Sequence, residues 1–281
     1  MRRLVALIAA AAVLPVAAPA RAGTAPLRYV AMGDSYSAAS GNVPPDPTAP
    51  PMCLRSTANY PHVIAAEIPV QLTDVTCGGA ETRHYFTAQY QGVAPQLDAV
   101  HKDTQLITMT IGGNDSAVFI DSVVECGAAG LSTLGQGSPC KDRYGSTFED
   151  TIRSTTYPSL VKALKAVRAK APHARVAILG YPWIMPAGGG CFPQMPVATG
   201  DVPYLRHLEA TLNDAVRRAA AATGAGYVDL STVSNGHDAC QAPGVRWVEP
   251  ALFGTNPVIV HPNALGEFQM AAQTLRTLRH A

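Results

Sequence analysis

The segment RYVAMGDS, residues 28–35, places a run of strand-forming residues directly before a Gly-Asp-Ser turn. Its first part, Arg28–Met32, predicts a buried strand. The turn lifts the hydroxyl of Ser35 above the end of this strand, where backbone N–H groups face the same space. A serine in that position can act as a nucleophile if a base lies within hydrogen-bond reach.

Four more β-rich runs follow along the chain, and helical patterns lie between them. Alternating strands and helices predict an α/β fold, in which five parallel strands form a sheet and helices cover both of its faces as a three-layer α/β/α arrangement. The further strands are expected at Val70–Val75, Gln105–Ile111, Arg175–Leu179 and Gly226–Leu230. The clearest helices are expected at Phe148–Lys170, Val202–Thr223 and Ala264–Arg279, where apolar residues return every three or four positions.

Stretches rich in Gly and Pro are expected to form long loops between these elements. Loops of such length in a compact domain are usually functional or tied down. The expected loops are Ser40–Ser56, Gly127–Gly145, Tyr181–Gly200 and Ser231–Asn256.

The composition of the 281 residues is that of a globular chain, with 47% hydrophobic and 15% charged residues. Twenty-one Lys and Arg residues nearly balance 20 Asp and Glu residues, so the net charge is +1. Binding to nucleic acid needs a strongly basic face, and the chain has too little excess positive charge to predict one. We therefore expect no nucleic-acid partner.

The first 22 residues have the pattern of a secretory signal peptide. Arg2 and Arg3 precede an apolar stretch from Leu4 to Ala20, and small residues around Ala22 predict the cleavage site. A retained membrane anchor is the weaker interpretation, because prolines interrupt the stretch. We expect a secreted protein whose residues 23–281 form a single domain, without stable insertion into a membrane and as a monomer.

Six cysteines lie in the expected mature chain. An even number of cysteines in an exported protein predicts disulfides. Fifteen pairings are possible, and the sequential one is the most economical, because each pair would then flank a loop rich in Gly and Pro. No Cys-x-x-Cys or His-x-x-x-His spacing occurs, so we expect no metal site. We expect no cofactor either. The predicted pairs are Cys53–Cys77, Cys126–Cys140 and Cys191–Cys240.

The residues that follow the predicted strands have complementary chemistry. In an open parallel sheet, ligands bind at the carboxyl ends of the strands. Ser35 follows the first strand, Gly79 the second and Asn114 the third, and His261 precedes the last helix. An imidazole is the usual base for a serine nucleophile. The N–H groups of Ser35 and Gly79 and the side-chain amide of Asn114 could stabilise an oxyanion.

Each of these motifs also has an ordinary structural explanation. Gly-Asp-Ser and Gly-Gly-Asn-Asp are common turns, and Asn263 in His-Pro-Asn can simply cap a helix. The order of the motifs and their placement after successive strands favour the catalytic interpretation.

The same residues resemble the SGNH, or GDSL-type, hydrolase superfamily, whose markers are the Ser of a Gly-Asp-Ser block, a Gly, an Asn and a His. The resemblance covers nearly the whole mature chain and implies that Ser35 is the nucleophile, His261 the base, and Gly79 and Asn114 oxyanion donors. The strings GDSYS (residues 33–37) and GHDAC (residues 236–240), with six cysteines, are similar to secreted actinobacterial lipases and esterases. That subfamily implies a flavodoxin-like fold and three sequential disulfides.

One position departs from the family pattern. Most SGNH enzymes have an aspartate three residues before the histidine, and this chain has Val258 there. The resemblance to relatives that use a main-chain carbonyl predicts a Ser–His dyad, with the histidine oriented by the carbonyl of Val258 in the first place or of Ile259. Asp229 and Glu249 are the alternative orienting groups. His237, beside Asp238, is a weaker candidate for the base, and Asp34 and Asp115 are expected to be structural.

The resemblance implies a secreted serine esterase or lipase that hydrolyses acyl esters through an acyl-enzyme. The alternatives are a phospholipase A or a carbohydrate acetylesterase that uses the same site, and a secreted binding domain without catalytic activity. The expected partner is an acyl ester or lipid substrate. Apolar residues of Tyr181–Met195 could line an acyl pocket, but packing of the core is the explanation we prefer.

Overall fold

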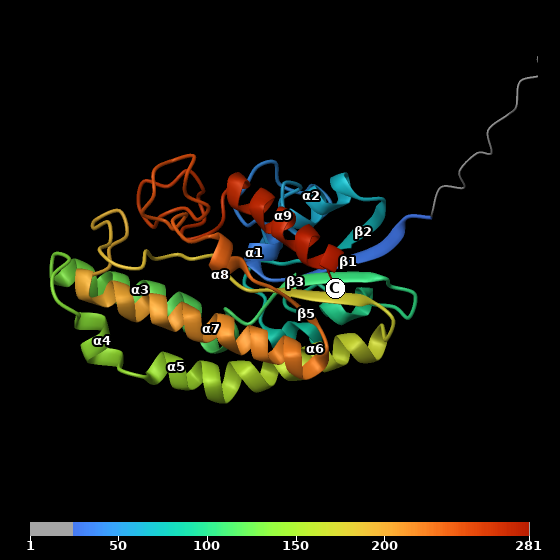
Figure 1. The fold of residues 1–281 in the computed structure, drawn as a ribbon, viewed down its shortest axis with the longest axis horizontal. Helices are drawn as coiled ribbons and strands as arrows, with labels where there is room; N and C mark the ends of the chain where they lie inside the picture. Colours follow the sequence, from blue (N-terminus) through green and yellow to red (C-terminus); the bar gives the residue numbers. More distant parts are fainter. Residues whose placement is uncertain (1–24, 281) are drawn as a thin grey trace, which may run out of the picture.

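The computed structural model describes residues 25–280, which form a five-stranded parallel sheet between two layers of helices (Figure 1). The strands lie in the order β2-β1-β3-β4-β5. The predicted α/β fold class is confirmed. The expected signal peptide lies outside the described residues. The bounds are Leu27–Gly33 for β1, Val70–Asp74 for β2, Leu106–Thr110 for β3, Arg175–Leu179 for β4 and Gly226–Val228 for β5.

The strand order explains where a ligand can bind. β1 pairs with β2 on one side and with β3 on the other, so that Tyr29 lies opposite both Leu72 and Leu106. The connections that leave β1 and β3 run in opposite directions across the sheet, which opens a crevice at the carboxyl ends of these two strands. Ser35 and Asn114 follow these two strand ends.

Helices cover the two faces of the sheet unequally (Figure 1). α2 and α9 pack together over one face, and α6 and α7 pack together over the other. On that side, residues of α3 and α7 line a common cavity. Among the described residues, no helix is long and apolar enough to cross a membrane. The helix bounds are Ser35–Ala38 for α1, Tyr60–Glu67 for α2, Val118–Ser132 for α3, Pro139–Tyr144 for α4, Thr147–Thr151 for α5, Tyr157–Lys170 for α6, Val202–Thr223 for α7, Leu230–Val233 for α8 and Ala264–His280 for α9.

The expected loop at residues 127–145 is wrong in large part. α3 extends through it to Ser132, and α4 occupies six of its later residues. Glycines inside α3 obscured the helical pattern. Gly130 serves close packing instead, because a side chain there would place its Cβ 2.2 Å from the carbonyl oxygen of Pro196.

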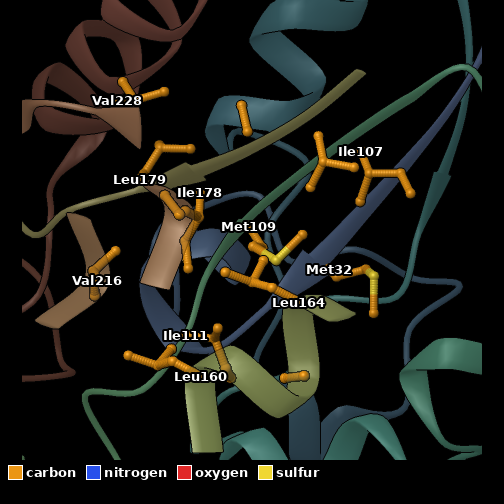
Figure 2. Packing of buried hydrophobic residues seen from close by; sticks show 14 of the residues in the cluster. Met32, Ile107, Met109, Ile111, Leu160, Leu164, Ile178, Leu179, Val216 and Val228 are labelled. Carbon is orange, nitrogen blue, oxygen red and sulfur yellow. The ribbon is translucent and has the colours of Figure 1, made fainter. Parts of the chain in front are cut away.

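The centre of the molecule is a continuous apolar core (Figure 2). All five residues of β3 are buried, as expected for a strand that is covered by helices on both faces. Met109 of β3 and Leu164 of α6 are fully buried in this core. Burying a side chain of this size stabilises the fold by roughly 1.5–3 kcal/mol. The sheet is therefore a stable support for the loops at its edge.

Three disulfides close the long loops, in the sequential pairing that the sequence predicts. Cys53–Cys77 connects the loop after α1 to the segment that follows β2. Cys126–Cys140 connects α3 to α4, and Cys191–Cys240 connects the loop after β4 to the loop after α8. No free cysteine occurs in the part of the chain that the structure describes.

Candidate active site

The Gly-Asp-Ser turn places Ser35 at the edge of the sheet, as the first residue of α1. Gly33 has φ +122°, and a Cβ atom there would lie 2.3 Å from the carbonyl oxygen of Thr110, so this position requires glycine. The Asp34 N–H then donates to the same oxygen at 2.9 Å. These contacts fix the start of α1 against the end of β3, and Ser35 is held at the crevice.

Asp34 is a buried anchor of this turn. Its Oδ1 accepts hydrogen bonds from the Tyr36 N–H at 3.0 Å and from the Thr110 hydroxyl at 2.6 Å. Its Oδ2 accepts a hydrogen bond from the hydroxyl of Tyr181 at 2.5 Å. Burial raises the pKa of Asp34 to about 6, against the opposing effect of these hydrogen bonds. Because all of these hydrogen bonds come from residues that hold the turn in place, Asp34 has the structural role expected for it.

His261 is buried, and its ring is oriented by a main-chain carbonyl. Its Nδ1 lies 2.7 Å from the carbonyl oxygen of Ile259. The choice of Val258 as the orienting carbonyl is therefore wrong, and Ile259 takes that place. Val260 has φ +59°, and this left-handed residue turns the chain so that the carbonyl two residues before His261 faces the ring. Burial lowers the pKa of His261, and the hydrogen bond to Ile259 opposes this only in part.

Tyr36 joins the serine helix to the histidine loop. Its hydroxyl donates to the carbonyl oxygen of Val260 at 2.7 Å, and its ring centroid lies 5.1 Å from that of His261. Within residues 25–280, no hydrogen bond joins the Ser35 hydroxyl directly to the His261 ring. Such contacts are often long in an enzyme without substrate and shorten when substrate binds.

The loops after β2 and β3 are fastened to each other beside Ser35. Asn114 donates from its side-chain amide to the carbonyl oxygen of Ala80 at 3.1 Å. The carboxylate of Asp115 accepts from both the N–H and the hydroxyl of Thr82, at 2.8 and 2.7 Å. Burial raises the pKa of Asp115 to about 6, with these hydrogen bonds opposing the shift. Gly79 has φ +72°, a conformation that favours glycine.

Two of the predicted oxyanion donors find no acceptor in the part of the chain that the structure describes. Across the described range, 25–280, the N–H groups of Ser35 and Gly79 donate to no protein acceptor. One N–H of the Asn114 amide bonds to Ala80, and its second N–H is left for another acceptor. The structure thus brings Ser35, Gly79, Asn114 and His261 to one edge of the sheet.

Sequence reasoning missed Tyr181, which connects two walls of this site. Its hydroxyl accepts from the N–H of Gly113 at 3.0 Å while it donates to Asp34. Its ring also packs edge-on against Tyr36, with centroids 5.2 Å apart. Tyr181 lies two residues after β4, so the rule that directs attention to the carboxyl ends of strands applies to it as well.

The carboxylates considered as orienting groups are engaged elsewhere. Asp229 caps α8 and accepts hydrogen bonds from Ser231 and Thr232. Glu249 forms a buried ion pair with Arg246 at 2.7 Å and accepts from the Asn263 amide at 2.8 Å. Burial raises the pKa of Glu249, but its hydrogen bonds together outweigh burial and hold the pKa below its ordinary value.

Glu249 instead supports the backbone of the histidine loop, because its N–H donates to the carbonyl oxygen of His261 at 2.9 Å. His237, the other candidate base, stacks on Trp247 with centroids 4.6 Å apart and bonds through Nδ1 to the Val245 carbonyl at 2.6 Å. It belongs to the scaffold beside the Cys191–Cys240 disulfide.

An apolar cavity of about 360 Å³ opens beside the Gly112–Gly113 turn. It lies between α3 and α7 and is closed by the segments 181–197 and 251–259. Ile184, Met185 and Met195 all line it, although Met185 and Met195 are also packed in a small apolar cluster. The packing explanation that we preferred for this segment is therefore incomplete.

Glu209 is the one acidic residue in the cavity wall that the structure describes. One of its carboxyl oxygens accepts from the N–H of Ile184 at 3.0 Å, and the other is buried without a partner. Burial raises the pKa of Glu209 to about 8, so the carboxyl is mostly protonated at neutral pH and the wall stays uncharged. No group of three or more potential metal ligands occurs among the described residues.

Comparisons with known proteins agree with this architecture. The model of the GDSL-like lipase/acylhydrolase family matches residues 31–267. Lipase 2 of Streptomyces coelicolor is 62% identical over 93% of this chain and 89% of its own length. The solved structures of an extracellular lipase from Streptomyces rimosus and of phospholipase A1 from Streptomyces albidoflavus have TM-scores of 0.74 and 0.75. Each is 29% identical and covers 91% of this chain and 99% of its own.

Proposed function

Since this chain belongs to the GDSL-like lipase/acylhydrolase family and is a carboxylic ester hydrolase, we propose that Ser35 is its nucleophile and His261 its general base. The observation that carries this proposal is the hydrogen bond from Tyr36 to Val260, which holds the histidine loop against the helix that begins at Ser35. The position of both residues near the crevice between β1 and β3, with an apolar cavity beside it, supports this proposal.

The hydrogen bond between His261 and Ile259 supports the assignment of the base. With its proton on Nδ1, the ring donates to the Ile259 carbonyl, and Nε2 carries the free lone pair. Nε2 takes the proton of the Ser35 hydroxyl as the serine oxygen attacks the ester carbonyl. The proton then passes to the leaving alcohol as the C–O bond breaks, and an acyl-enzyme remains. In the second half, Nε2 takes a proton from water as the water oxygen attacks the acyl carbon, and it returns this proton to the Ser35 oxygen as the bond to the acyl group breaks and the carboxylic acid leaves.

The N–H groups of Ser35 and Gly79 and the second N–H of Asn114 form the proposed oxyanion hole. Donors without partners in the free protein can bind the developing oxyanion without first breaking another bond, and one such donor stabilises the transition state by about 3–4 kcal/mol. The bond from Asn114 to Ala80 keeps the amide beside the Gly79 loop, and Asp115 fixes the same two loops through Thr82.

The apolar cavity supports an ester with a hydrocarbon chain as the substrate. Its lining along α3 runs from Val118 to Leu131, a length of about 20 Å at 1.5 Å per residue. An extended acyl chain fits such a channel better than an acetyl group does. This favours a lipase or a phospholipase A over a carbohydrate acetylesterase. The similarity to phospholipase A1 keeps the second of these as a candidate.

The same set of observations supports secretion. The proposed signal peptide at residues 1–22, the three disulfides and the similarity to an extracellular lipase support export of residues 23–281 as one domain. We propose that the mature protein acts as a monomer.

Hydrolysis of p-nitrophenyl esters from acetyl to palmitoyl tests this function. We expect release of p-nitrophenol that rises with chain length, and a loss of kcat of about a thousandfold or more in Ser35→Ala and in His261→Ala. Ser40→Ala is the matched control, since Ser40 is buried nearby and its hydroxyl finds no partner among residues 25–280. Full activity of Ser35→Ala would overturn the assignment, and a preference for acetyl esters would favour the acetylesterase.

A further inference from the structure

Exposed apolar side chains gather on the side of α3 that borders the cavity. Ile120, Val124 and Leu131 are about half exposed, and their spacing of four and seven residues places them on one face of the helix. Val124 and Leu131 also line the cavity. The outer edge of this cavity wall is therefore apolar and open to solvent.

The segment 251–259, which also lines the cavity, has the same character. Leu252, Phe253 and Ile259 are exposed, and Leu252 and Ile259 line the cavity as well. Phe253 is 80% exposed and has φ +61°, which is unusual for a bulky residue. Within the described residues, neither packing nor backbone preference accounts for an aromatic ring at that position.

These six residues, Ile120, Val124, Leu131, Leu252, Phe253 and Ile259, are named here the apolar rim. Four of them belong to both the cavity and the outer surface, so the rim continues the path that an acyl chain would follow into the site. Exposed apolar patches around a binding groove are typical of surfaces that contact a partner or a lipid.

The charges around the rim decide which lipid surface fits. α3 carries Asp121 and Glu125 and no Lys or Arg, and residues 250–260 carry no charged side chain. Arg143 of α4 lies 3.9 Å from Glu125, so its charge is balanced by that carboxylate, and the rim lacks the clustered basic residues that attract anionic lipids. The rim therefore fits a neutral or zwitterionic surface.

We propose that the apolar rim docks on the surface of a neutral or zwitterionic lipid aggregate and delivers the acyl chain from that surface into the cavity. This rests on the proposed function, because it assigns the same cavity to the acyl chain. Apolar side chains that enter the interface release water from their surface and hold the enzyme there. Hydrolysis of a soluble ester at Ser35 and His261 does not depend on the rim residues that lie outside the cavity.

Binding to phosphatidylcholine vesicles tests the proposal separately from catalysis. The test uses the full mature chain with Ser35→Ala, so that lipid is not consumed, with and without the pair Ile120→Gln and Phe253→Asn. Neither of these two residues lines the cavity, glutamine suits a helix, and asparagine tolerates positive φ. Phe268→Asn is the matched control, because Phe268 is an exposed phenylalanine on α9, over the other face of the sheet.

We expect the pair to lower the vesicle-bound fraction about tenfold, and the control to leave it unchanged. In active protein, the pair should leave hydrolysis of soluble p-nitrophenyl butyrate within about twofold and reduce hydrolysis of a vesicle-borne long-chain ester about tenfold. Absence of butyrate hydrolysis by the unaltered enzyme would contradict the proposed function and not the docking surface.

Three results would overturn the docking proposal. The first is vesicle binding that the pair does not reduce. The second is binding to phosphatidylglycerol vesicles alone, which would mean attraction by charge. The third is a dimer in light scattering that the pair dissociates, which would make the rim an interface between two copies of this chain.

Discussion

The hydroxyl of Tyr36 donates a 2.7 Å hydrogen bond to the carbonyl oxygen of Val260, more than 200 residues later in the chain. This bond holds the turn in which Val260 adopts φ +59° and the Ile259 carbonyl meets the ring of His261. In the proposed mechanism, main-chain groups thus perform the orienting task that a carboxylate performs in most serine hydrolases. Because a carbonyl carries only a partial charge, it stabilises the imidazolium less than a carboxylate would.

The pH dependence of hydrolysis should follow the ionisation of His261. The base must be neutral, and burial lowers the pKa of His261 below its ordinary value of 6.5. We expect kcat/KM for a soluble ester to rise with pH through a midpoint below 6.5 and then to level off. Asp34 has a pKa of about 6, so an NMR titration of the His261 ring must confirm the assignment. A midpoint above 7 in either measurement would be inconsistent with a buried base paired only to a carbonyl.

No single carboxylate should behave as a triad member. Asp229→Asn should leave kcat nearly unchanged, because Asp229 only caps α8, whereas loss of a true triad acid costs about ten-thousandfold in a serine protease. Kinetics on folded protein, checked by circular dichroism, measure this. A loss of kcat of a thousandfold or more would identify Asp229 as the third member of the triad.

Glu249→Gln should affect stability more than chemistry. The substitution leaves the buried Arg246 without its ionic partner, and breaking a buried pair in this way costs about 3–5 kcal/mol. We expect a clearly lower midpoint of thermal unfolding, with kcat reduced less than about tenfold in the protein that remains folded. A large loss of kcat at unchanged stability would show instead that Glu249 acts on His261.

Tyr181 is expected to position the site through its hydroxyl. Tyr181→Phe removes the bonds to Asp34 and Gly113, and we expect kcat to fall roughly tenfold to hundredfold while KM changes little. Tyr204→Phe is the matched control, because the Tyr204 hydroxyl is buried and has no hydrogen-bond partner in the described part of the chain. Equal kinetic effects in the two variants would rule out a positioning role for Tyr181.

Glu209 should make the protein less stable as the pH rises. Its carboxyl ionises near pH 4.5 in the unfolded chain but only at about 8 in the fold, so the folded state retains a proton between these values. The free energy of unfolding then falls by up to about 1.4 kcal/mol per pH unit within that window. Glu209→Gln should lose this part of the slope, whereas Asp214→Asn, an exposed change on α7, should keep it. Urea unfolding at pH 5 and pH 8 measures the difference.

Local sequence patterns predicted those site residues whose position depends on residues close to them in the sequence. Ser35 and Asn114 follow strands directly, so the rule for parallel sheets locates them. The hydrogen bond between Tyr181 and Asp34 joins residues 147 positions apart, and only the assembled sheet shows it. The left-handed turn at Val260 is hidden because valine, a β-branched residue, does not favour that conformation. Consequently Ile259 and Val258 could not be distinguished.

The most direct test of the central claim is labelling of the active enzyme with a fluorophosphonate, followed by peptide mapping. We predict a single phosphonyl adduct on Ser35, formed rapidly by the unaltered protein and at least about a hundredfold more slowly by His261→Ala, since the base activates the serine. An adduct on another serine with Ser35 unmodified, or labelling of Ser35 at the same rate without His261, would contradict the account.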